Sequence, residues 1–165
     1  MELTKVAFGG GCYWCTEAIF QSLIGVEKVA QGFISSKGKN DSFSEAVIVY
    51  FNKKTTLKTL IEIHLHTHKS TKEHSMRAKY RSAIYYFTKE QEEKSTQILA
   101  ALQIDFKEEI ITQILPFKKF KPSIEASQNY YIKNAGKPFC QKYINPKLDL
   151  IVRNFSSHIN PRNMP

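Results

Sequence analysis

The sequence predicts one α/β (α+β) domain in which a mixed sheet and its helices form a two-layer sandwich. Short segments with strand patterns alternate along the chain with segments whose apolar residues recur at helical spacing. No internal repeat or linker interrupts this alternation, and 165 residues are enough to bury one sizeable core. We therefore expect a single domain over residues 1–165.

The first half of the chain is predicted to contain three strands and one helix. Its first apolar residues alternate with polar ones, which favours a strand. Three glycines then break the pattern before a helical spacing begins, and Gly25 is placed to end that helix in a left-handed conformation. The predicted elements are a strand at 3–8, a helix at 12–24, a strand at 26–34, a polar loop at 35–44 and a strand at 46–51.

The second half is predicted to contain three helices and two strands. Thr55 or Thr56 can cap the first of these helices, and Thr88 with Gln91 forms a capping box at the start of the next. The predicted elements are a helix at 57–68, a polar segment at 69–79, a strand at 82–87, a helix at 88–102, a strand at 110–115 and a short helix at 123–133. Residues 134–165, which include four prolines, are expected to form a mostly irregular tail.

The composition, with 42% hydrophobic and 24% charged residues, indicates a soluble globular protein. No apolar run is as long as a membrane span, and no long apolar stretch follows the first residues. We therefore expect no membrane partner and a cytoplasmic location. Three cysteines are an odd and small number for a disulfide scaffold, so reactive or buried free thiols are expected.

The net charge of +9 raises the question of nucleic-acid binding. The lysines, however, are scattered along the chain rather than collected in one block. No zinc-finger, helix-turn-helix or RNA-binding signature accompanies them. We therefore favour a solvated basic surface and do not expect nucleic acid as a partner.

The strongest local signal is the stretch Gly9-Gly10-Gly11-Cys12-Tyr13-Trp14-Cys15-Thr16-Glu17. A thiol in the first turn of a helix sees unpaired backbone N–H groups and the positive end of the helix dipole, which both favour the thiolate. Tyr13 and Trp14 can form an apolar wall around a small methyl-bearing group of a substrate. Cys12 is therefore the candidate nucleophile, and a buried structural cysteine is the alternative interpretation.

This stretch resembles the signature of the peptide methionine sulfoxide reductase A family. Later motifs of the family are matched in the same order, from about Val6 to Cys140. The matching segments are Ser44-Glu45-Ala46-Val47, Lys79-Tyr80-Arg81-Ser82-Ala83-Ile84 (for Gln-Tyr-Arg-Ser-Ala-Ile), Phe120-Lys121-Pro122, Gln128-Asn129-Tyr130-Tyr131 and Lys137-Pro138-Phe139-Cys140. The first motif is specific, and the others gain weight because they are collinear. With this resemblance we expect a ferredoxin-like core within the sandwich.

The resemblance implies thiol-dependent reduction of methionine S-sulfoxide, in peptides or proteins or as free methionine, without a cofactor. Cys12 would attack the sulfoxide sulfur, Glu45 would protonate the leaving oxygen, and Tyr80 would help to bind that oxygen. The sulfenic acid left on Cys12 would condense with a resolving thiol, and Cys140 matches the family's position for it. Thioredoxin or a similar dithiol would reduce the disulfide, and we expect the protein to be a monomer.

The pocket around the departing oxygen differs from the family pattern. The loop after the second predicted strand is short, so the family's second oxygen-binding tyrosine has no clear counterpart. The family's aspartate, counted back from Tyr80, falls on Ser75. We hypothesise that His74 or Ser75 takes over part of this polar work. The chain would then be a divergent reductase or a paralogue of reduced activity that only binds its ligand.

Two further features leave other interpretations open. Cys12 and Cys15 form a C-x-x-C pair at a helix start, which is typical of thiol–disulfide oxidoreductases, so Cys15 is either a buried residue, which we favour, or a resolving thiol. His64 and His68 share one face of a predicted helix at a spacing that suits zinc. That face is also apolar, and the sequence shows no complete four-ligand set. We therefore favour core or half-buried histidines and expect no metal site.

Overall fold

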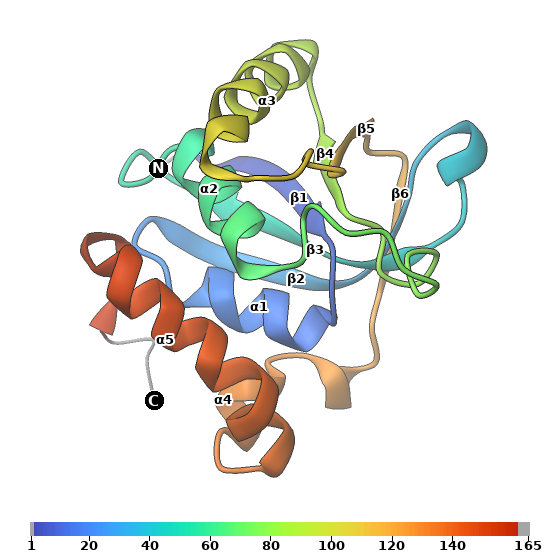
Figure 1. Cartoon of the computed structure of the whole chain (residues 1–165). Coiled ribbons are helices and arrows are strands. Elements are labelled where there is room, and N and C mark those ends of the chain that lie inside the picture. The colour runs from blue at the N-terminus through green and yellow to red at the C-terminus, as the bar shows by residue number, and fades with distance from the viewer. Residues whose placement is uncertain (1, 162–165) are drawn as a thin grey trace.

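A computed structural model describes residues 2–161 and is built around a mixed six-stranded sheet (Figure 1). The strands are β1 (Thr4–Gly9), β2 (Val26–Ser35), β3 (Ser44–Phe51), β4 (Ala83–Tyr86), β5 (Gln113–Pro116) and β6 (Lys119–Pro122). Their order across the sheet is β5-β4-β1-β3-β2-β6. The pair β4 and β5 is parallel, and the other neighbouring pairs are antiparallel.

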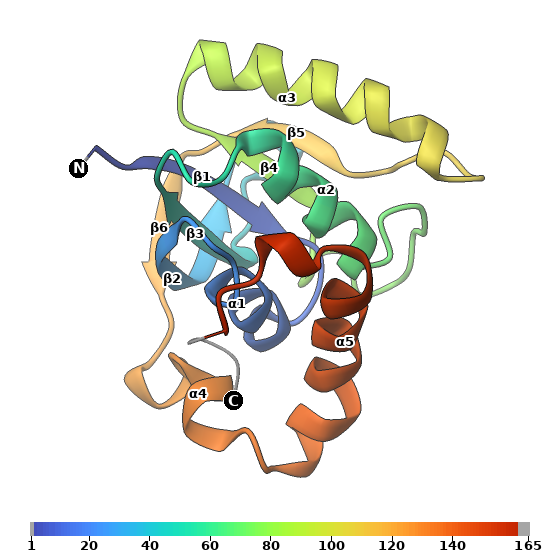
Figure 2. The ribbon, with the colours of Figure 1, turned by 90° about the vertical axis from the view of Figure 1, so that its left-hand side faces the viewer.

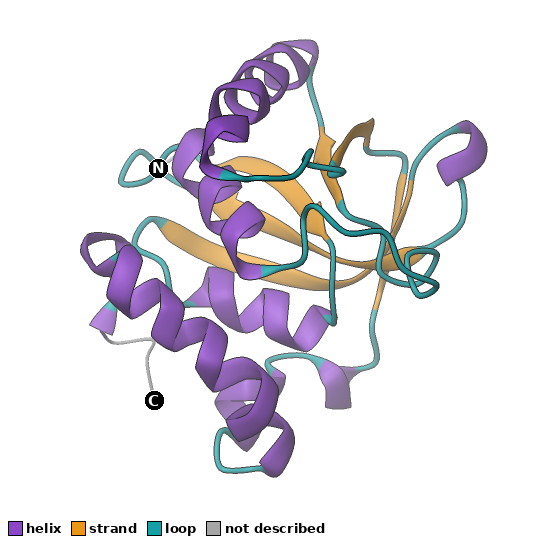
Figure 3. Cartoon of the chain, viewed as in Figure 1, coloured by secondary structure: helices purple, strands orange, loops and turns teal. Residues whose placement is uncertain are grey.

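Helices pack around this sheet (Figure 3). They are α1 (Tyr13–Gln21), α2 (Leu57–Thr67), α3 (Lys89–Leu102), α4 (Tyr130–Asn134), a π-helical turn (Cys140–Ile144) and α5 (Asn145–Asn154). The predicted caps are confirmed, because the hydroxyl of Thr56 accepts a hydrogen bond from the N–H of Thr59 and that of Thr88 from Gln91. Within residues 2–161, no helix is long and apolar enough to span a membrane.

The elements from β1 to β4 confirm the predicted ferredoxin-like core. Two antiparallel β-strand pairs meet in the order β4-β1-β3-β2, and the helices α1 and α2 connect them. Because side chains alternate along a strand, Val6 and Phe8 face the main core while Ala7 faces the other side of the sheet. The main core lies between the sheet and the helices and includes Val6, Phe8, Phe20, Leu23, Val47, Val49, Leu60, Ile61, Leu65 and Ile84.

The C-terminal region corrects the prediction of an irregular tail. Residues 138–154 run as a continuous helical segment that ends with α5. Pro146 lies at the start of α5, directly after the π-helical turn. Ile144, Leu148 and Ile151 are buried on the inner face, and α5 stands beside α1 and α2 (Figure 2). The spacing of Ile144, Leu148 and Ile151 is helical, but the prolines obscured this pattern in the sequence.

Two other segments differ from the prediction. The strand β6 extends the sheet next to β2, although its lysines favour a polar loop; it is an edge strand with one face in solvent. Within the predicted helix at 123–133, a short 3-10 turn at Glu125–Ser127 is followed by the five residues of α4. The end of the predicted tail, residues 162–165, lies outside the described residues.

Candidate active site

Cys12 lies where the glycine-rich turn after β1 meets α1. It is the N-cap residue of this helix, and its carbonyl accepts hydrogen bonds from the N–H groups of Cys15 and Thr16 at 3.1 and 3.2 Å. The pKa of its thiol is lowered, first by a hydrogen bond from the Cys15 thiol and then by the N–H of Trp14. Burial and the charge of Glu45 oppose this shift without cancelling it. The helix start therefore favours the partly exposed thiolate.

Cys15 supports this thiolate from within the core. It is buried, and its hydrogen bond to Cys12 together with its burial raises its own pKa, so it stays protonated as a donor. Lys147 of α5 interacts electrostatically with both thiols, and its ammonium donates to the carbonyl of Thr67 at the end of α2. A positive charge held at this place adds to the preference for the thiolate.

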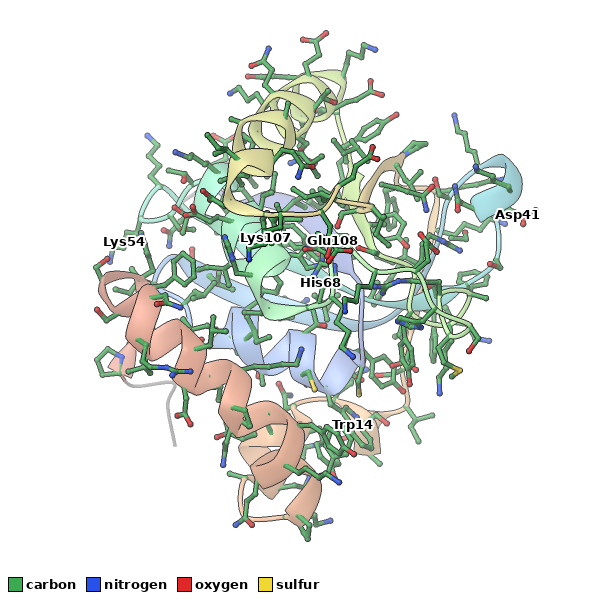
Figure 4. All side chains as sticks on the ribbon, in the orientation of Figure 1. Trp14, Asp41, Lys54, His68, Lys107 and Glu108 are labelled. Atoms are coloured by element: carbon green, nitrogen blue, oxygen red, sulfur yellow. The ribbon has the colours of Figure 1, made fainter. Side chains whose placement is uncertain are left out.

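Side chains from outside α1 hold the backbone of the glycine turn. His64 contacts the carbonyl of Gly9 through Nε2 at 2.8 Å, and Arg77 donates to the carbonyl of Gly10 at 3.0 Å. The imidazole ring of His68, labelled at the end of α2 in Figure 4, lies directly against Gly10. A Cβ atom on Gly10 would come within 2.5 Å of that ring. The close approach of the ring therefore requires glycine at this position.

The structure brings Glu45, the candidate acid, next to this turn. It lies in β3 and is only 5% exposed. Its Oε1 accepts the N–H of Tyr13, the residue that follows Cys12, at 3.0 Å. Burial raises the pKa of the Glu45 carboxyl, and the N–H of Tyr13 and the nearby Lys79 oppose that rise only in part. A carboxyl group of raised pKa is suited to protonate a leaving oxygen.

Lys79 approaches the other oxygen of Glu45 from the loop before β4. Lys79 Nζ lies 3.6 Å from Glu45 Oε2 and 5.1 Å from the centroid of the Tyr80 ring. The Lys79 carbonyl accepts hydrogen bonds from the N–H of Glu45 and from Ser44 Oγ, both at 2.9 Å. These bonds fix the end of the loop to β3. The half-buried ring of Tyr80 lies next to the Lys79 ammonium group.

His74 and Ser75 lie in the same loop but do not reach the reacting groups. Both side chains are exposed, and His74 Nδ1 accepts a local hydrogen bond from the N–H of Met76 at 3.1 Å. Within residues 2–161, neither makes a hydrogen bond to Cys12 or Glu45. The side chain that lies beside the Glu45 carboxyl group is Lys79, from the end of the same loop. Sequence reasoning did not single out this lysine.

The aromatic side chains near the thiol form a larger group than the sequence indicates. Trp14 stacks on Tyr130 of α4 with ring centroids 3.7 Å apart, and it meets Phe139 edge-on at 5.2 Å (Figure 4). Tyr13 contacts Phe33 of β2, with centroids 5.5 Å apart. Phe33 lies directly opposite the candidate acid in the register of β2 and β3. Its place in the site depends on that register, which no local sequence signal reveals.

Cys140, the predicted resolving thiol, lies in the π-helical turn rather than on an irregular tail. It is fully buried in the same apolar cluster as Cys15, and burial raises the pKa of its thiol. All three cysteines are free. The Cys15 thiol hydrogen-bonds to Cys12, and it also interacts electrostatically with Cys140.

Of the two histidines with zinc-like spacing, His64 is buried in the core and His68 is half-buried at the end of α2. Three of the four ring nitrogens of His64 and His68 contact backbone carbonyls or a serine hydroxyl, and burial lowers the pKa of His68 to about 3. A separate group of possible metal ligands has its donor atoms within 4.8 Å of one another and consists of Glu62, His66 and Asp105. This group shares no residue with the thiol site, and we assign it no metal chemistry.

A family model described as "Peptide methionine sulfoxide reductase" matches residues 4–159. The chain belongs to the peptide methionine sulfoxide reductase family. A similar relative is the peptide methionine sulfoxide reductase MsrA of Pasteurella multocida, which is 32% identical over 158 residues, or 87% of this chain and 91% of that protein. MsrA 1 of Rhodopirellula baltica is 33% identical over 165 residues, or 91% of this chain and 86% of that protein.

The fold is similar to that of Mxr1 from Saccharomyces cerevisiae in its reduced form, with a TM-score of 0.75 at 22% identity over 84% of this chain and 90% of that one. The complex of Mxr1 with Trx2 gives a TM-score of 0.63 at 21% identity, over 78% and 85%. These likenesses confirm the predicted fold class. Membership of the peptide methionine sulfoxide reductase family confirms the resemblance, the enzyme class and the reaction that the sequence predicts, reduction of methionine sulfoxide.

Proposed function

We propose that this reductase acts on the S epimer of methionine sulfoxide, in peptides or as the free amino acid, with Cys12 as nucleophile and Glu45 as acid. The observation that carries the proposal is the hydrogen bond from the N–H of Tyr13 to Glu45, because it joins a buried carboxyl group to the residue beside the thiolate. The net reaction converts one sulfoxide and two thiols into methionine, a disulfide and water. The thiols supply both electrons.

In the first step, the Cys12 thiolate attacks the sulfoxide sulfur while the Glu45 carboxyl protonates the oxygen. The S–O bond breaks and the oxygen passes to the cysteine, which becomes a sulfenic acid as the thioether of methionine is released. Two electrons thus move from the sulfur of Cys12 to the substrate sulfur, and Glu45 is left as a carboxylate that regains a proton from solvent. Tyr13, Trp14 and Phe33 supply apolar surface for the substrate methyl group.

In the second step, a thiol attacks the sulfenic acid, which forms a disulfide and releases water. We assign this role to Cys140, which lies buried in the π-helical turn before α5. A thioredoxin-like dithiol would reduce the disulfide, a proposal supported by the structure of the similar protein Mxr1 in complex with Trx2. A cytoplasmic location, where such dithiols remain reduced, is consistent with three free cysteines.

Cys15 is the second candidate for the resolving thiol, because it already contacts Cys12. The variants Cys140→Ser and Cys15→Ser separate the candidates. If Cys140 resolves the sulfenic acid, Cys140→Ser completes one turnover and then stops with thioredoxin as reductant, while Cys15→Ser continues to turn over. The opposite pattern assigns the role to Cys15. Loss of even the first turnover in Cys15→Ser would favour a thiol–disulfide oxidoreductase of the C-x-x-C type.

The direct test of the proposed function measures reduction of the S and R epimers separately, with dithiothreitol as reductant. We expect turnover of the S epimer and a loss of at least about a thousandfold in Cys12→Ser, because no other group supplies the nucleophile. Equal turnover of the R epimer would remove the stereochemical part of the proposal. Sulfoxide reduction that survives Cys12→Ser would remove the mechanism.

A further inference from the structure

The side of the site that would face the sulfoxide oxygen, here called the oxygen side, is formed by Glu45 and Lys79. The mechanism above uses Glu45 but not the positive charge of Lys79. Glu45 Oε1 is occupied by the N–H of Tyr13, so Oε2 is the oxygen left to face a substrate. Lys79 Nζ lies 3.6 Å from this Oε2, and its side chain is 55% exposed, so a small ligand can reach the ammonium group. The family's motif Gln-Tyr-Arg-Ser-Ala-Ile has glutamine where this chain has Lys79. The ammonium group is thus a feature of this chain and not of the family motif.

The chain holds this ammonium group in place from several directions. The Lys79 carbonyl is bonded to the N–H of Glu45 and to the hydroxyl of Ser44, so the Lys79 backbone moves together with β3. The ammonium lies 5.1 Å from the centroid of the Tyr80 ring, within the range of a cation–π contact. Arg77 donates to the carbonyls of both Gly10 and Tyr80 at 3.0 Å, which joins this loop to the turn of the nucleophile.

The reaction requires more than one hydrogen-bond donor at the sulfoxide oxygen. This oxygen carries much of the negative charge of the S–O bond, and it gains more as the bond breaks. A protonated carboxyl group supplies one donor, and donors placed where charge develops are among the largest contributors to catalysis. The sequence shows no clear counterpart of the family's second oxygen-binding tyrosine. With Glu45 and Tyr80 as the predicted donors, the place of that second tyrosine is left for another side chain.

We propose that Lys79 is a further catalytic residue, whose ammonium group binds the sulfoxide oxygen beside Glu45 and stabilises the charge that develops on it. This inference rests on the proposed function, because it concerns the same oxygen. Lys79 keeps its proton in the step: Glu45 transfers the proton, the oxygen passes to Cys12, and the lysine contributes hydrogen bonds and charge. Its effect is directed at the oxygen, so binding of a thioether without that oxygen should not depend on it.

The alternative role of Lys79 is an ion pair that only lowers the pKa of the carboxyl group. The charged or titratable groups that face Glu45 are Lys79 and the Cys12 thiol, and those that face Lys79 are Glu45 and Tyr80. Hydrogen bonding to Tyr80, with a smaller effect of Glu45, raises the pKa of Lys79, so the lysine remains charged wherever the acid titrates. Activity should therefore fall as the pH rises through the pKa of Glu45, and removing Lys79 should move that fall to higher pH.

The test compares single-turnover reduction of methionine S-sulfoxide as a function of pH in four variants: Lys79→Met, Lys79→Gln, Lys79→Arg and the control Lys72→Met. Lys72 is an exposed residue of the same loop. Loss of a donor at a developing oxyanion costs about a hundredfold or more, and solvent exposure of the lysine reduces this to about tenfold to thirtyfold. We expect Lys79→Met to lose that factor at its best pH, Lys79→Gln to lose less, and Lys79→Arg and the control to stay within about threefold.

The inference would be overturned if Lys79→Met kept the maximum rate and only its loss of activity at high pH moved to higher pH. Lys79 would then act only as the ion-pair partner of Glu45. Equal losses of affinity for methionine and for its sulfoxide would also overturn it, because oxygen binding predicts loss for the sulfoxide alone. Failure of the proposed function looks different: the unmodified protein then fails to reduce the sulfoxide, or Cys12→Ser retains the activity. Circular dichroism and thermal unfolding of Lys79→Met, matched to the control, exclude a folding defect.

Discussion

The thiol side and the oxygen side of the site are built in different ways. On the thiol side, Cys12 starts a helix, Cys15 donates to it from the core, and the buried ring of His68 packs under the preceding turn. On the oxygen side, Glu45 is buried, but its neighbour Lys79 comes from a loop and is half exposed. The proposed nucleophile is therefore held by the core, whereas the group proposed to bind the oxygen is open to change.

This difference separates what is common to the family from what is particular to this chain. On the thiol side, Cys12 and Cys15 lie within nine consecutive residues between the end of β1 and the first turns of α1, and His68 at the end of α2 packs against Gly10. The oxygen side is assembled from β3 and from the loop before β4, whose residues tolerate substitution because most are exposed. Chemistry at the sulfur should therefore follow the family, while recognition of the oxygen can diverge.

Glu45→Gln tests whether the buried part of the oxygen side is a proton donor. The amide can keep the hydrogen bond from Tyr13 but cannot donate an acidic proton, so we expect the single-turnover rate to fall by about a hundredfold to a thousandfold. The exposed Glu109→Gln is the matched control. A loss of less than about threefold would mean that the proton comes from elsewhere. The contrast would then rest on Lys79 alone.

Gly10→Ala tests how tightly the core holds the thiol side. The new methyl group meets the His68 ring, whose two nitrogens are already bonded, so the ring cannot swing away. We expect the free energy of unfolding to fall by about 2–3 kcal/mol in urea titrations. Gly11→Ala is the control, since nothing lies within 4 Å of its added Cβ. Equal stabilities of the two variants would show that the turn is not held as tightly as we describe.

Cys15→Ala sharpens the account of how the thiolate is stabilised. The Cys15 thiol is the largest contributor to the lowered pKa of Cys12, so its removal should raise that pKa and move the pH dependence of alkylation by iodoacetamide to higher pH. At a pH below the midpoint, each unit of this shift slows alkylation about tenfold. Cys140→Ala should leave the midpoint where it is. A midpoint unchanged in Cys15→Ala would assign the thiolate to the helix start alone.

The sequence predicts the fold well where local patterns decide it. The strand before the glycine turn and the caps at Thr56 and Thr88 depend on neighbouring residues, so they could be read directly. The C-terminal helix could not, because Pro146 obscures a helical spacing that becomes clear only when Ile144 and Leu148 are seen to bury one face. The strand β6 was missed because an edge strand with lysines on its outer face resembles a loop.

For the site, the sequence predicts the residues that a specific motif carries and misses those placed by tertiary structure. Cys12 follows from its own turn, and Glu45 from the resemblance. Phe33 and Lys79 could not be found, because their positions depend on strand register and on the path of a loop. Counting along the motif pointed to Ser75, which the structure leaves exposed. A residue count gives no direction to a side chain in an irregular loop.

That Cys12 itself takes the oxygen from the sulfoxide is tested most directly by a single turnover of the double variant Cys15→Ser/Cys140→Ser at pH 8. In this variant Cys12 is the remaining cysteine. The variant is mixed with methionine S-sulfoxide in the presence of dimedone, and both methionine and labelled peptides are measured by mass spectrometry. We predict one methionine per chain and one dimedone adduct, on Cys12, because oxygen transfer leaves a sulfenic acid there. Methionine formed without an adduct on Cys12 would contradict the account, as would no methionine from a variant whose circular dichroism shows it to be folded.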